Sequence, residues 1–527
     1  MTEYKLFNNL AEMVENSANL YGDNPAFTLK DRVITYSDML ADIKAVARLF
    51  TKKGYAGKRV ALIGKNCYEW VLIHLSTMYT GSVLVPMDKG LKEFEIESQI
   101  CRSKTDVLFV VGNMKLPALE VTVENDVEKF IEDAKLLSED ENEKYVIDSH
   151  KMSMLLFTSG TTDNSKAVML SQYNITSNIY ALSLHERFTT DDASLVLLPL
   201  HHTFGMVALL LFLSLGMNNG FCDGLKITKS IEDYNTNVLV GVPLIADAIY
   251  KTAQRKLKAM KLDKLINTLI KISRAFLKVK IDLRKLFFAK IRKQIGEPLN
   301  FVIIGGAALS PEVEQWFNDI GIYTVQGYGL TECSPVLCAE NPENMRLGSV
   351  GTALPGIDMQ ISEPDAEGIG EIIAKGDNIM LGYYENEELT NEVLKDGYFY
   401  TGDLGFIDKD GFIWITGRKK NMIVLKNGKN VFPEEIEELI GKYEFIKECM
   451  VYGEVEGDDD MICAYIVCDK EKNPGKTDEE FKDMVDVMIK EVNEKLISYK
   501  KIRKTVISDK LLERTSTMKI KRNQKVN

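Results

Sequence analysis

A chain of 527 residues is too long for one hydrophobic core, so its length predicts roughly two to four globular units. The net charge of −12 argues against nucleic acid as the main partner, because binding to a phosphate backbone needs a net basic face. The eight cysteines lack zinc-ligand spacing, which favours free thiols in a reducing compartment. The N-terminus has no signal-peptide pattern, and the longest apolar run, residues 207–215, is well short of the ~20 residues that span a membrane. We therefore expect a cytoplasmic protein.

Residues 1–345 alternate short apolar runs with helical segments. The runs are rich in β-branched residues, and several end in Gly, Ser or Thr loops, which is where ligands bind in parallel sheets. The helix expected between the first two runs, "YEWVLIHLSTMYTG", is interpreted as amphipathic. The expected strands are "RVALIG", "VLVPM", "DVLFVV", "MSMLLFT", "SLVLLPL", "NVLVGVP" and "LNFVIIGG".

From about Arg346 the pattern changes to short runs between Gly and Asp turns, which predicts a compact antiparallel unit. A further change after "TGRKKN" predicts a separate small α+β domain with one long helix, "DEEFKDMVDVMIKEVNEKL". The predicted fold class is therefore α/β. The N-terminal domain, residues 1–417, has sheet subdomains over 1–345 and a β-barrel-like subdomain over 346–417, and the C-terminal domain covers 418–527.

Residues 255–293 form a strongly basic segment inside an acidic protein. Apolar residues recur in it at helical spacing, which predicts one or more basic amphipathic helices. Two interpretations are open: a solvated helical face packed on the sheet, or a surface that lies against anionic lipid. In the second case, charge reversal at Lys271, Lys278 and Lys285 should weaken binding to anionic vesicles.

The stretch "TSGTTDNSK", residues 158–166, has the composition of a phosphate-binding loop. Its backbone N–H groups and hydroxyls can cradle phosphate oxygens, and Lys166 adds a positive charge. The alternative is an ordinary connection from a strand to a helix, with hydroxyls that cap the helix.

A second candidate stretch is "VQGYGLTECSPV", residues 325–336. Gly327 and Gly329 flank Tyr328, so a planar base can approach the ring and the backbone closely. Glu332 is a candidate magnesium ligand. Taken alone, it would be an ordinary solvated glutamate.

Two further stretches add charged candidates. Asp403 in "YTGDLG" can accept two hydrogen bonds from a ribose diol, and Arg418 in "ITGRKKN" can bridge ribose and phosphate. Lys519 lies among basic residues in "RTSTMKIKRN". Each of these alone would be a surface charge.

Together, in this order, the stretches resemble the adenylate-forming superfamily of acyl-CoA synthetases, luciferases and peptide-synthetase adenylation domains. The similarity is greatest to long-chain fatty acid–CoA ligases, and it covers nearly the whole chain. It is most specific at "QGYGLTE", at "LPLHHTFGM" and at "GYFYTGDLGFIDKDGFIWITGRKKNMIVLKNGKNVFPEEIE".

The resemblance implies a two-step reaction with ATP, Mg²⁺ and coenzyme A. A carboxylate first attacks the α-phosphate of ATP, and the thiol of coenzyme A then displaces AMP from the acyl-adenylate. Thr158 and Glu332 are implied to hold magnesium. The residues implied to contact ATP or coenzyme A are Thr158, Ser159, Gly160, Thr161, Thr162, Lys166, Gly306, Ala307, Gln326, Gly327, Tyr328, Gly329, Thr331, Asp403, Arg418 and Gly428.

The resemblance also implies catalytic roles for Lys519, His202, Glu332 and Lys420. Lys519 would offset negative charge at the α-phosphate and carboxylate oxygens. The C-terminal domain would then swing about a hinge near residues 418–420, at Lys420, which brings the loop with Gly428 to the pantetheine channel. His202 is implied to orient the acyl carboxylate or the thioester oxyanion, although a single histidine is as readily structural. The residues implied to border the acyl group are His202, Phe204, Gly205, Val242 and Gly305.

This chain departs from the family pattern in the phosphate loop, where Asp163, Ser165 and Ala167 replace Gly, Pro and Gly. Gln172 also stands where a histidine is usual, and Met518 where glycine is common. An Asp163 carboxylate that caps the following helix or pairs with Lys166 would be tolerated. One aimed at the phosphates would be repelled by ~1 kcal/mol or more, and glycine there would lower the ATP requirement.

We therefore expect an ATP-dependent acyl-CoA synthetase for a medium- or long-chain fatty acid. The alternatives are a ligase for an aryl or carrier-protein-bound acid, and a weakly active homologue that binds nucleotide or acyl-adenylate. The sequence leaves chain length and oligomeric state open.

Overall fold

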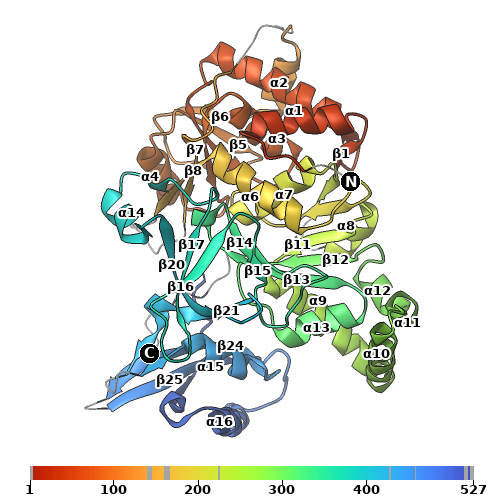
Figure 1. The fold of residues 1–527 in the computed structure, drawn as a ribbon, viewed down its shortest axis with the longest axis vertical. Helices are drawn as coiled ribbons and strands as arrows, with labels where there is room; N and C mark the ends of the chain where they lie inside the picture. The colour runs from red at the N-terminus through yellow and green to blue at the C-terminus, as the bar shows by residue number, and fades with distance from the viewer. Residues whose placement is uncertain are drawn as a thin grey trace. The chain divides into compact units, whose positions relative to one another are not determined.

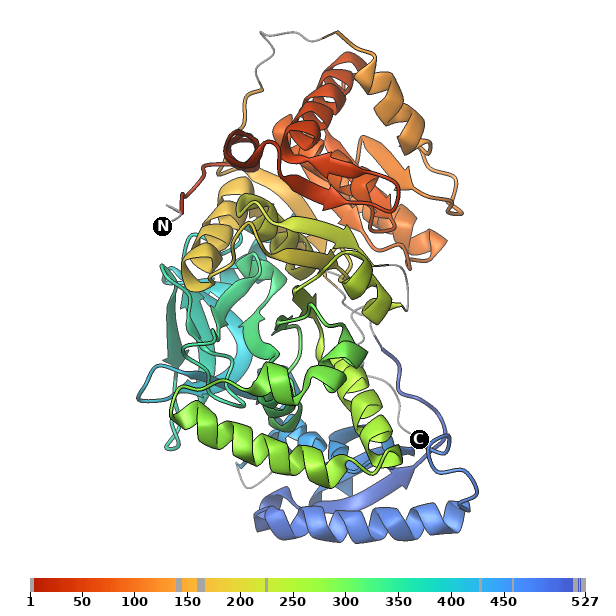
Figure 2. The same cartoon turned by 90° about the vertical axis from the view of Figure 1, so that its right-hand side faces the viewer.

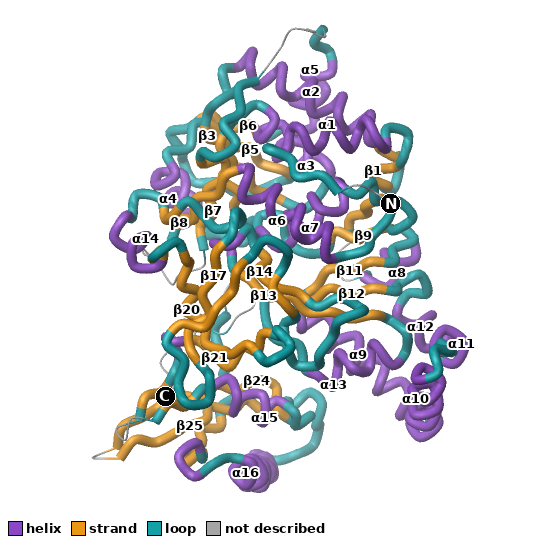
Figure 3. The backbone as a smooth tube through the Cα atoms, in the orientation of Figure 1, coloured by secondary structure: helices purple, strands orange, loops and turns teal. Residues whose placement is uncertain are grey.

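The computed structural model describes residues 4–138, 145–158, 166–222, 226–425, 429–456, 459–514, 520 and 522. The chain divides into two compact units. Unit 1 comprises Met1–Met359, Ala374–Phe399 and Lys409–Ile413, and unit 2 comprises Gln360–Ile373, Tyr400–Asp408 and Trp414–Asn527. The predicted α/β class, with parallel sheets, antiparallel strands and a separate C-terminal α+β part, is confirmed (Figures 1 and 3).

One sheet of unit 1 has seven strands in the order β18-β8-β7-β4-β3-β5-β6. Strand β3 pairs in parallel with β4 and β5, whereas β8 is antiparallel to both β7 and β18. The strands are β3 Arg59–Gly64, β4 Val83–Met87, β5 Val107–Val111, β6 Thr122–Glu124, β7 Met152–Phe157, β8 Ala167–Ser171 and β18 Gly382–Tyr383. The helices around it include α2 Tyr36–Lys53, α3 Tyr68–Tyr79, α4 Glu93–Ser103 and α5 Val127–Lys135.

Helix α3 is not amphipathic, contrary to the expectation from its sequence. Ten of its twelve residues are buried, and one of them is His74. Burial lowers the pKa of the His74 imidazole to about 3. The reason is that α3 contacts α1 (Leu10–Tyr21), α2 and α5 as well as the sheet strands β3 and β4, so no face remains for solvent.

The second sheet of unit 1 has nine strands in the order β15-β14-β13-β12-β11-β9-β10-β1-β2. Parallel pairing runs from β13 to β1, and antiparallel strands close both edges. The strands are β1 Pro25–Thr28, β2 Val33–Thr35, β9 Ala193–Val196, β10 Asn218–Phe221, β11 Val238–Gly241, β12 Phe301–Ile304, β13 Tyr323–Gly329, β14 Val336–Ala339 and β15 Thr352–Ala353. The associated helices include α6 Gln172–His185, α7 Thr203–Ser214, α8 Ile227–Asp233 and α13 Pro311–Asp319.

The register of this sheet brings three predicted site segments together. Gly241 at the end of β11 lies opposite Ile304 at the end of β12, and Ile304 lies opposite Gln326 in β13. Because parallel strands end at the same edge of a sheet, the segments after β11 and β12 meet beside Gln326.

The basic segment, residues 255–293, is helical as predicted. It begins within α9 (Pro243–Ala259) and continues through α10 (Asp263–Lys278), α11 (Arg284–Phe287) and α12 (Ala289–Ile295). Figure 2 shows α10 in full length along one border of unit 1. Helix α10 contacts α9, α11 and α13. No helix in the described parts of the chain is long and apolar enough to span a bilayer.

A five-stranded sheet has the order β16-β17-β20-β19, with β21 paired to β20. Its strands are β16 Asp358–Ser362, β17 Gly370–Lys375, β19 Leu394–Lys395, β20 Tyr398–Ile407 and β21 Ile413–Arg418, with α14 at Glu387–Val393. Residues 423–507, all within unit 2, contain β22 Ile423–Val424, β23 Asn430–Val431, β24 Ile446–Glu456, β25 Asp459–Cys468, β26 Ile502–Ile507, α15 Pro433–Gly441 and α16 Asp478–Lys495. The boundary at residues 417 and 418 and its hinge stay predictions.

Candidate active site

The predicted phosphate loop is the connection of a β-hairpin. Thr158 directly follows β7 and Lys166 directly precedes β8, and the Thr158 N–H donates to the Lys166 carbonyl oxygen at 2.9 Å. The Thr158 hydroxyl donates to the same oxygen at 3.3 Å. These bonds close the loop at its base. Residues 159–165, with the predicted contacts Ser159, Gly160, Thr161 and Thr162, lie outside the described residues.

The element after this loop is a strand and not a helix, so the alternative interpretation, an ordinary strand-to-helix connection, is wrong. Strand β8 pairs on both sides, with β7 and β18, and four of its five residues are buried. Helix α6 begins only at Gln172, where the Ser171 hydroxyl caps it by accepting from the Asn174 N–H at 3.0 Å. Asp163 lies outside the described residues, and no helix directly follows its loop for it to cap.

Tyr383 connects Lys166 with Glu332. Its hydroxyl donates to Glu332 Oε1 at 2.9 Å, and Lys166 Nζ lies 3.5 Å from that hydroxyl and 4.7 Å from the ring centroid. Burial and the nearby Glu332 charge raise the pKa of Tyr383 well above its usual value, so the phenol keeps its proton. The pairing of β18 with β8 places Tyr383 opposite Val168 and so creates this arrangement.

Glu332 fits the predicted role of a magnesium ligand. It lies in a short 3-10 helix, Thr331–Cys333, directly after β13. Within the described part of the chain, the Glu332 carboxylate accepts a hydrogen bond from the Tyr383 hydroxyl. This bond involves Oε1 and leaves Oε2 for a metal ion. A carboxylate oxygen and the Thr158 hydroxyl are both hard oxygen donors, which Mg²⁺ prefers.

The predicted adenine stretch forms the hairpin between β13 and β14. Gly329 is required there by close packing, because a Cβ at this position would lie 1.8 Å from the Pro335 carbonyl oxygen. A Cβ at Gly327 would lie 3.4 Å from the Cys338 carbonyl oxygen. Tyr328 is half-buried and pairs across the hairpin with Cys338.

Gln326 is buried and connects this hairpin to the turn after β12. Its Oε1 accepts from the Leu309 N–H at 2.8 Å, and its Nε2 donates to Glu314 Oε2 at 2.7 Å. The Gln326 N–H donates to Glu340 Oε2 at 3.1 Å. Gln326 therefore links the β13–β14 hairpin to the turn after β12 and to α13 through hydrogen bonds, and its contact with adenine stays a prediction.

Glu314 and Glu340 form a buried carboxyl pair. Burial, and then the Glu340 charge, raise the pKa of Glu314 to about 8. Glu340 accepts from the Arg346 and Gln326 N–H groups and from the Ser349 hydroxyl. These donors favour the charged form of Glu340, so the proton of the pair resides on Glu314.

The turn after β12 is the "GGAAL" stretch, and its first glycine packs on a predicted acyl-site residue. A Cβ on Gly305 would lie 2.8 Å from the Phe204 ring, so the ring covers this glycine. Gly306 has φ +81°, a left-handed conformation that favours glycine, and a Cβ at this position would lie 3.8 Å from Val242 Cγ1. Gly306 and Ala307 are exposed, as an open binding surface requires.

His202 lies in a cluster with His201 and Asp88. The imidazole centroids are 4.1 Å apart, and His201 Nε2 lies 3.5 Å from Asp88 Oδ2. His201 and the Gly90 N–H, which donates to Asp88 Oδ1, hold the pKa of the Asp88 carboxyl well below its usual range. The possible ligand atoms of the three residues lie within 4.8 Å of one another. A negative charge therefore faces the histidine pair.

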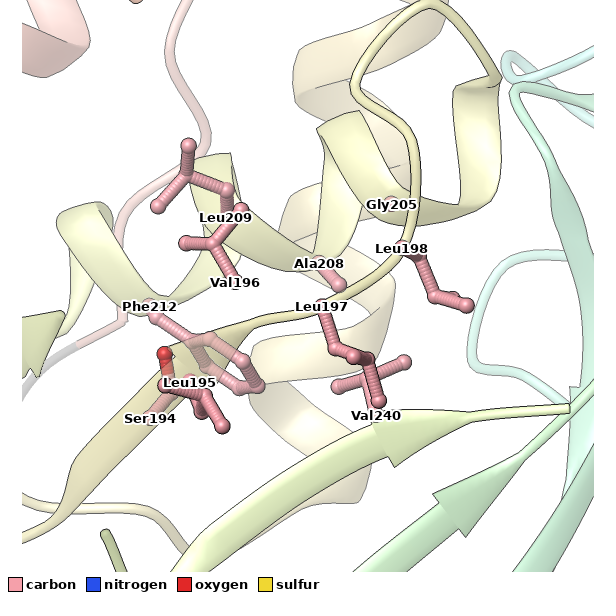
Figure 4. A pocket seen from close by; sticks show the side chains of 10 residues that line it. All are labelled: Ser194, Leu195, Val196, Leu197, Leu198, Gly205, Ala208, Leu209, Phe212 and Val240. Carbon is pink, nitrogen blue, oxygen red and sulfur yellow. The ribbon is translucent and has the colours of Figure 1, made fainter. Parts of the chain in front are cut away.

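A small apolar cavity lies behind Gly205, between α7 and strands β9 and β11 (Figure 4). Its volume is ≈ 10 Å³, which is about the room needed for one water molecule, so it does not hold an acyl chain as it stands. Its lining residues are Ser194, Leu195, Val196, Leu197, Leu198, Gly205, Ala208, Leu209, Phe212 and Val240.

Within unit 2, two of the predicted nucleotide residues form an ion pair. Arg418 Nε lies 2.7 Å from Asp403 Oδ1, and the Asp403 side chain is only 4% exposed, against 39% for Arg418. Asp403 lies in β20 and Arg418 ends β21. Lys420 is exposed in the 3-10 helix that follows, Lys419–Asn421. Gly428 and Lys519 lie outside the described residues.

Several residues that shape the site did not emerge from the sequence. Tyr383, Asp88, Glu314 and Glu340 lie in stretches without a motif, and their positions depend on pairing between distant segments. Two signals were available: Asp88 directly follows the expected strand "VLVPM", and Tyr383 belongs to the tyrosine pair in "LGYYEN".

Comparison with known proteins identifies the class. A family model described as AMP-binding enzyme matches residues 14–384, and one described as AMP-binding enzyme C-terminal domain matches residues 420–527. The chain therefore belongs to the AMP-binding enzyme family, and the predicted resemblance is confirmed.

Two relatives and one solved structure illustrate this similarity. Long-chain-fatty-acid–CoA ligase FadD15 of Mycobacterium bovis is 26% identical over 95% of this chain and 92% of its own length. The chloroplastic long-chain-fatty-acid–[acyl-carrier-protein] ligase AEE15 of Arabidopsis thaliana is 27% identical over 89% of this chain and 78% of its own. O-succinylbenzoate coenzyme A synthetase (MenE) of Bacillus subtilis, in complex with AMP, has the same fold, with a TM-score of 0.76, 22% identity and 97% coverage of both chains.

Proposed function

We propose that this protein is an ATP-dependent acyl-CoA synthetase for medium- or long-chain fatty acids. In the first step a carboxylate oxygen attacks the α-phosphorus of ATP, the bond to the bridging oxygen breaks, and pyrophosphate leaves. In the second step the thiolate of coenzyme A attacks the acyl carbonyl carbon, and AMP leaves. Adenylation is needed because a carboxylate is a poor electrophile, whereas AMP is a good leaving group.

The arrangement of Lys166, Tyr383 and Glu332 carries this proposal. The Lys166 ammonium group and the Glu332 carboxylate both contact the neutral phenol of Tyr383. All three lie at the base of a loop that is rich in hydroxyl side chains. The lysine would contact the outer phosphates of ATP, and the glutamate would hold the metal ion with Thr158. A bound Mg²⁺ supplies charge neutralisation for the departing pyrophosphate. Tyr383 keeps Lys166 and Glu332 in position without adding a charge.

The remaining roles follow the family motifs. We propose that the exposed turn at Gly306 and Ala307, together with Tyr328, accepts the adenine. Asp403 would accept hydrogen bonds from the ribose hydroxyls, and its ion pair with Arg418 fixes the orientation of the carboxylate. His202 would orient the acyl carboxylate.

Support for a fatty acid comes from relatives such as FadD15, whose name states a long-chain fatty acid and coenzyme A. Two observations support other acids or acceptors. AEE15 is named for an acyl-carrier-protein acceptor, and MenE is named for O-succinylbenzoate. A third alternative is weak turnover, because the phosphate loop has Asp163 in place of glycine.

Pyrophosphate release across a panel of acids tests the proposal. We expect release with acids of medium to long chain, dependent on ATP and Mg²⁺, and coenzyme A consumption in equal amount. Turnover only with aryl acids, or acyl transfer only to a carrier protein, would replace it with the corresponding alternative. If no acid drives pyrophosphate or AMP formation, the synthetase assignment is wrong.

A further inference from the structure

The charge of this protein is distributed unevenly along the chain. Residues 255–293 contain fourteen lysines and arginines and two aspartates, a net charge of +12 in a chain whose total is −12. All 39 of these positions belong to unit 1. The remainder of the protein is strongly acidic, so this segment is a local exception to the overall charge and calls for a specific explanation.

Helix α10, Asp263–Lys278, exposes apolar side chains to solvent. Leu265 is 53% exposed, Ile272 40% and Phe276 38%, and Val279 directly after the helix is 65% exposed. At about 100° per residue, these four positions fall within roughly 60° of one another around the helix axis. They form a continuous stripe, which we name the α10 stripe. Exposed large apolar residues continue beyond it at Met260, Ile281 and Leu286.

The stripe is not the face of α10 that packs on the protein. That face carries Ile266 and Ser273, which are buried, and Leu269 and Ile270, which pack against the core of unit 1. Arg274 fixes the rotation of the helix, because its guanidinium makes two hydrogen bonds to Asp319 in α13, at 2.7 and 2.6 Å. The α10 stripe is therefore held toward solvent.

A row of lysines flanks the stripe on its solvent side. Lys264, Lys271 and Lys278 are spaced by seven residues and lie roughly 110° around the helix from the stripe. All three are exposed, and none makes an ion pair within the described part of the chain. The positions between them and the stripe hold the small residues Thr268 and Ala275. Such an order of apolar stripe, small residues and lysine row suits a helix lying at a membrane interface.

We propose that the α10 stripe and the row of Lys264, Lys271 and Lys278 form a docking surface for an anionic lipid bilayer. The stripe would enter the boundary between headgroups and acyl chains, and the lysines would contact lipid phosphates and carboxylates. The proposal stands on the geometry of α10 and does not depend on the reaction that the protein catalyses.

The alternative occupants fit this surface less well. A nucleic acid backbone would pair with the lysines but would gain nothing from four exposed aliphatic and aromatic side chains. A second copy in a twofold contact would bring the same basic surface against itself, and the lysine rows would repel. An anionic bilayer can bury the apolar stripe and can also pair with the lysine row.

Cosedimentation with vesicles tests the proposal in the absence of ATP, acid and coenzyme A. The full-length protein is mixed with phosphatidylcholine vesicles that contain or lack phosphatidylserine, at low and at high salt. The wild type should bind the vesicles with phosphatidylserine and dissociate as salt rises. The triple variant Lys264→Glu, Lys271→Glu, Lys278→Glu should bind roughly 100-fold less tightly, since each lysine near the surface contributes about fivefold.

A matched control uses the same charge change on another exposed helix. The variant Lys482→Glu, Lys490→Glu, Lys495→Glu in α16 alters the total charge equally, and it should bind as the wild type does. A second arm keeps every charge and replaces Ile272 and Val279 by serine, which should lower binding at high salt as well. Val487→Ser in α16, where Val487 is 59% exposed, is its control.

Several outcomes would overturn the proposal. Equal loss of binding in both charge variants would show a net-charge effect and not a surface. Equal binding to vesicles without phosphatidylserine would exclude anionic lipid as the partner. Tighter binding to single-stranded RNA than to vesicles, or a dimer that only the α10 variants dissociate, would assign the surface to those partners instead. Failure of acyl-CoA synthesis would leave the vesicle result unaffected.

Discussion

At the residue scale, the site depends on a neutral hydroxyl between two opposite charges. The sequence predicts Lys166 and Glu332 as site residues. In the proposed site a third group must hold the two charges near each other and prevent a direct ion pair between them. Tyr383 fills this place, because burial keeps its proton and its hydroxyl donates to the glutamate. A direct ion pair would compete with phosphate and metal for both side chains.

The variant Tyr383→Phe should lower pyrophosphate release about tenfold or more and raise the Mg²⁺ requirement. It removes a hydrogen bond to a charged group, which typically contributes ~1.5–3 kcal/mol, and leaves Glu332 free to rotate. Initial rates as a function of MgATP and of free Mg²⁺ measure the effect, and the circular dichroism spectrum should stay unchanged.

The adjacent Tyr384→Phe is the matched control. The Tyr384 hydroxyl accepts from Arg59 at 2.8 Å and has no contact with Glu332, so its removal should leave the Mg²⁺ requirement as in the wild type. Equal kinetics for Tyr383→Phe and the wild type would contradict the positioning role of Tyr383.

At the element scale, one hydrogen-bond network joins α13, β13 and β14. Gln326 in β13 bonds to Glu314 in α13 and to Glu340 after β14, and it also holds the turn after β12 through Leu309. The network connects the β13–β14 hairpin, which we propose as part of the adenine site, to the core. Its cost is the burial of two carboxyl groups, one of which must carry a proton.

This network predicts a loss of stability at alkaline pH. The pKa of Glu314 is raised from its ordinary 4.5 to about 8 in the folded protein. A raised carboxyl pKa stabilises the fold fully below about pH 4.5, and this contribution is lost as the pH rises through about 8. Glu314→Gln mimics the protonated acid, since its carbonyl can accept from Gln326 as Glu314 Oε2 does, and the amide places no charge beside Glu340.

We expect Glu314→Gln to melt about 5 °C or more above the wild type at pH 8.5, and within about 2 °C of it at pH 5.5. Thermal denaturation at the two pH values measures the difference. Glu312→Gln, an exposed change on the same helix, is the control and should follow the wild type at both. A constant offset between Glu314→Gln and the wild type would refute the shared-proton assignment.

At the scale of the whole molecule, the two family matches divide the proposed chemistry between two parts of the chain. The phosphate loop, the adenine hairpin and Glu332 belong to the segment at residues 14–384, whereas Lys519 belongs to the segment at 420–527. The second segment has its own core around α15, α16 and β24–β26, so a change in its tail need not disturb the first.

Lys519→Ala should separate the two half-reactions. We expect pyrophosphate release to fall by ~100-fold or more, because the lysine charge would be needed only while charge builds on the α-phosphate. Acyl-CoA formation from supplied acyl-adenylate and coenzyme A should stay within about threefold of the wild type. Lys525→Ala, a nearby change in the same basic tail, should affect neither. An equal loss of both half-reactions would assign Lys519 a structural role.

Much of the fold followed from local patterns. Each apolar run expected as a strand in residues 59–304 is one, because a β-branched run of that length buries well only in a sheet interior. The errors arose where the structure of a segment depends on the segments that pack against it. Helix α3 is buried on all sides by other helices, and the segment after Lys166 is drawn into the sheet by two strand partners.

The order of the motifs along the chain is enough to identify the class of the protein and to nominate Lys166, Glu332, Asp403 and Arg418 as site residues, because motif residues keep their order along the chain. How these side chains are held follows from the three-dimensional fold alone. Pairing of β18 with β8 brings Tyr383 to Lys166 across more than two hundred residues, and packing of α13 against β13 buries Glu314 beside Glu340. Such contacts depend on which distant segments become neighbours, and no local pattern carries that information.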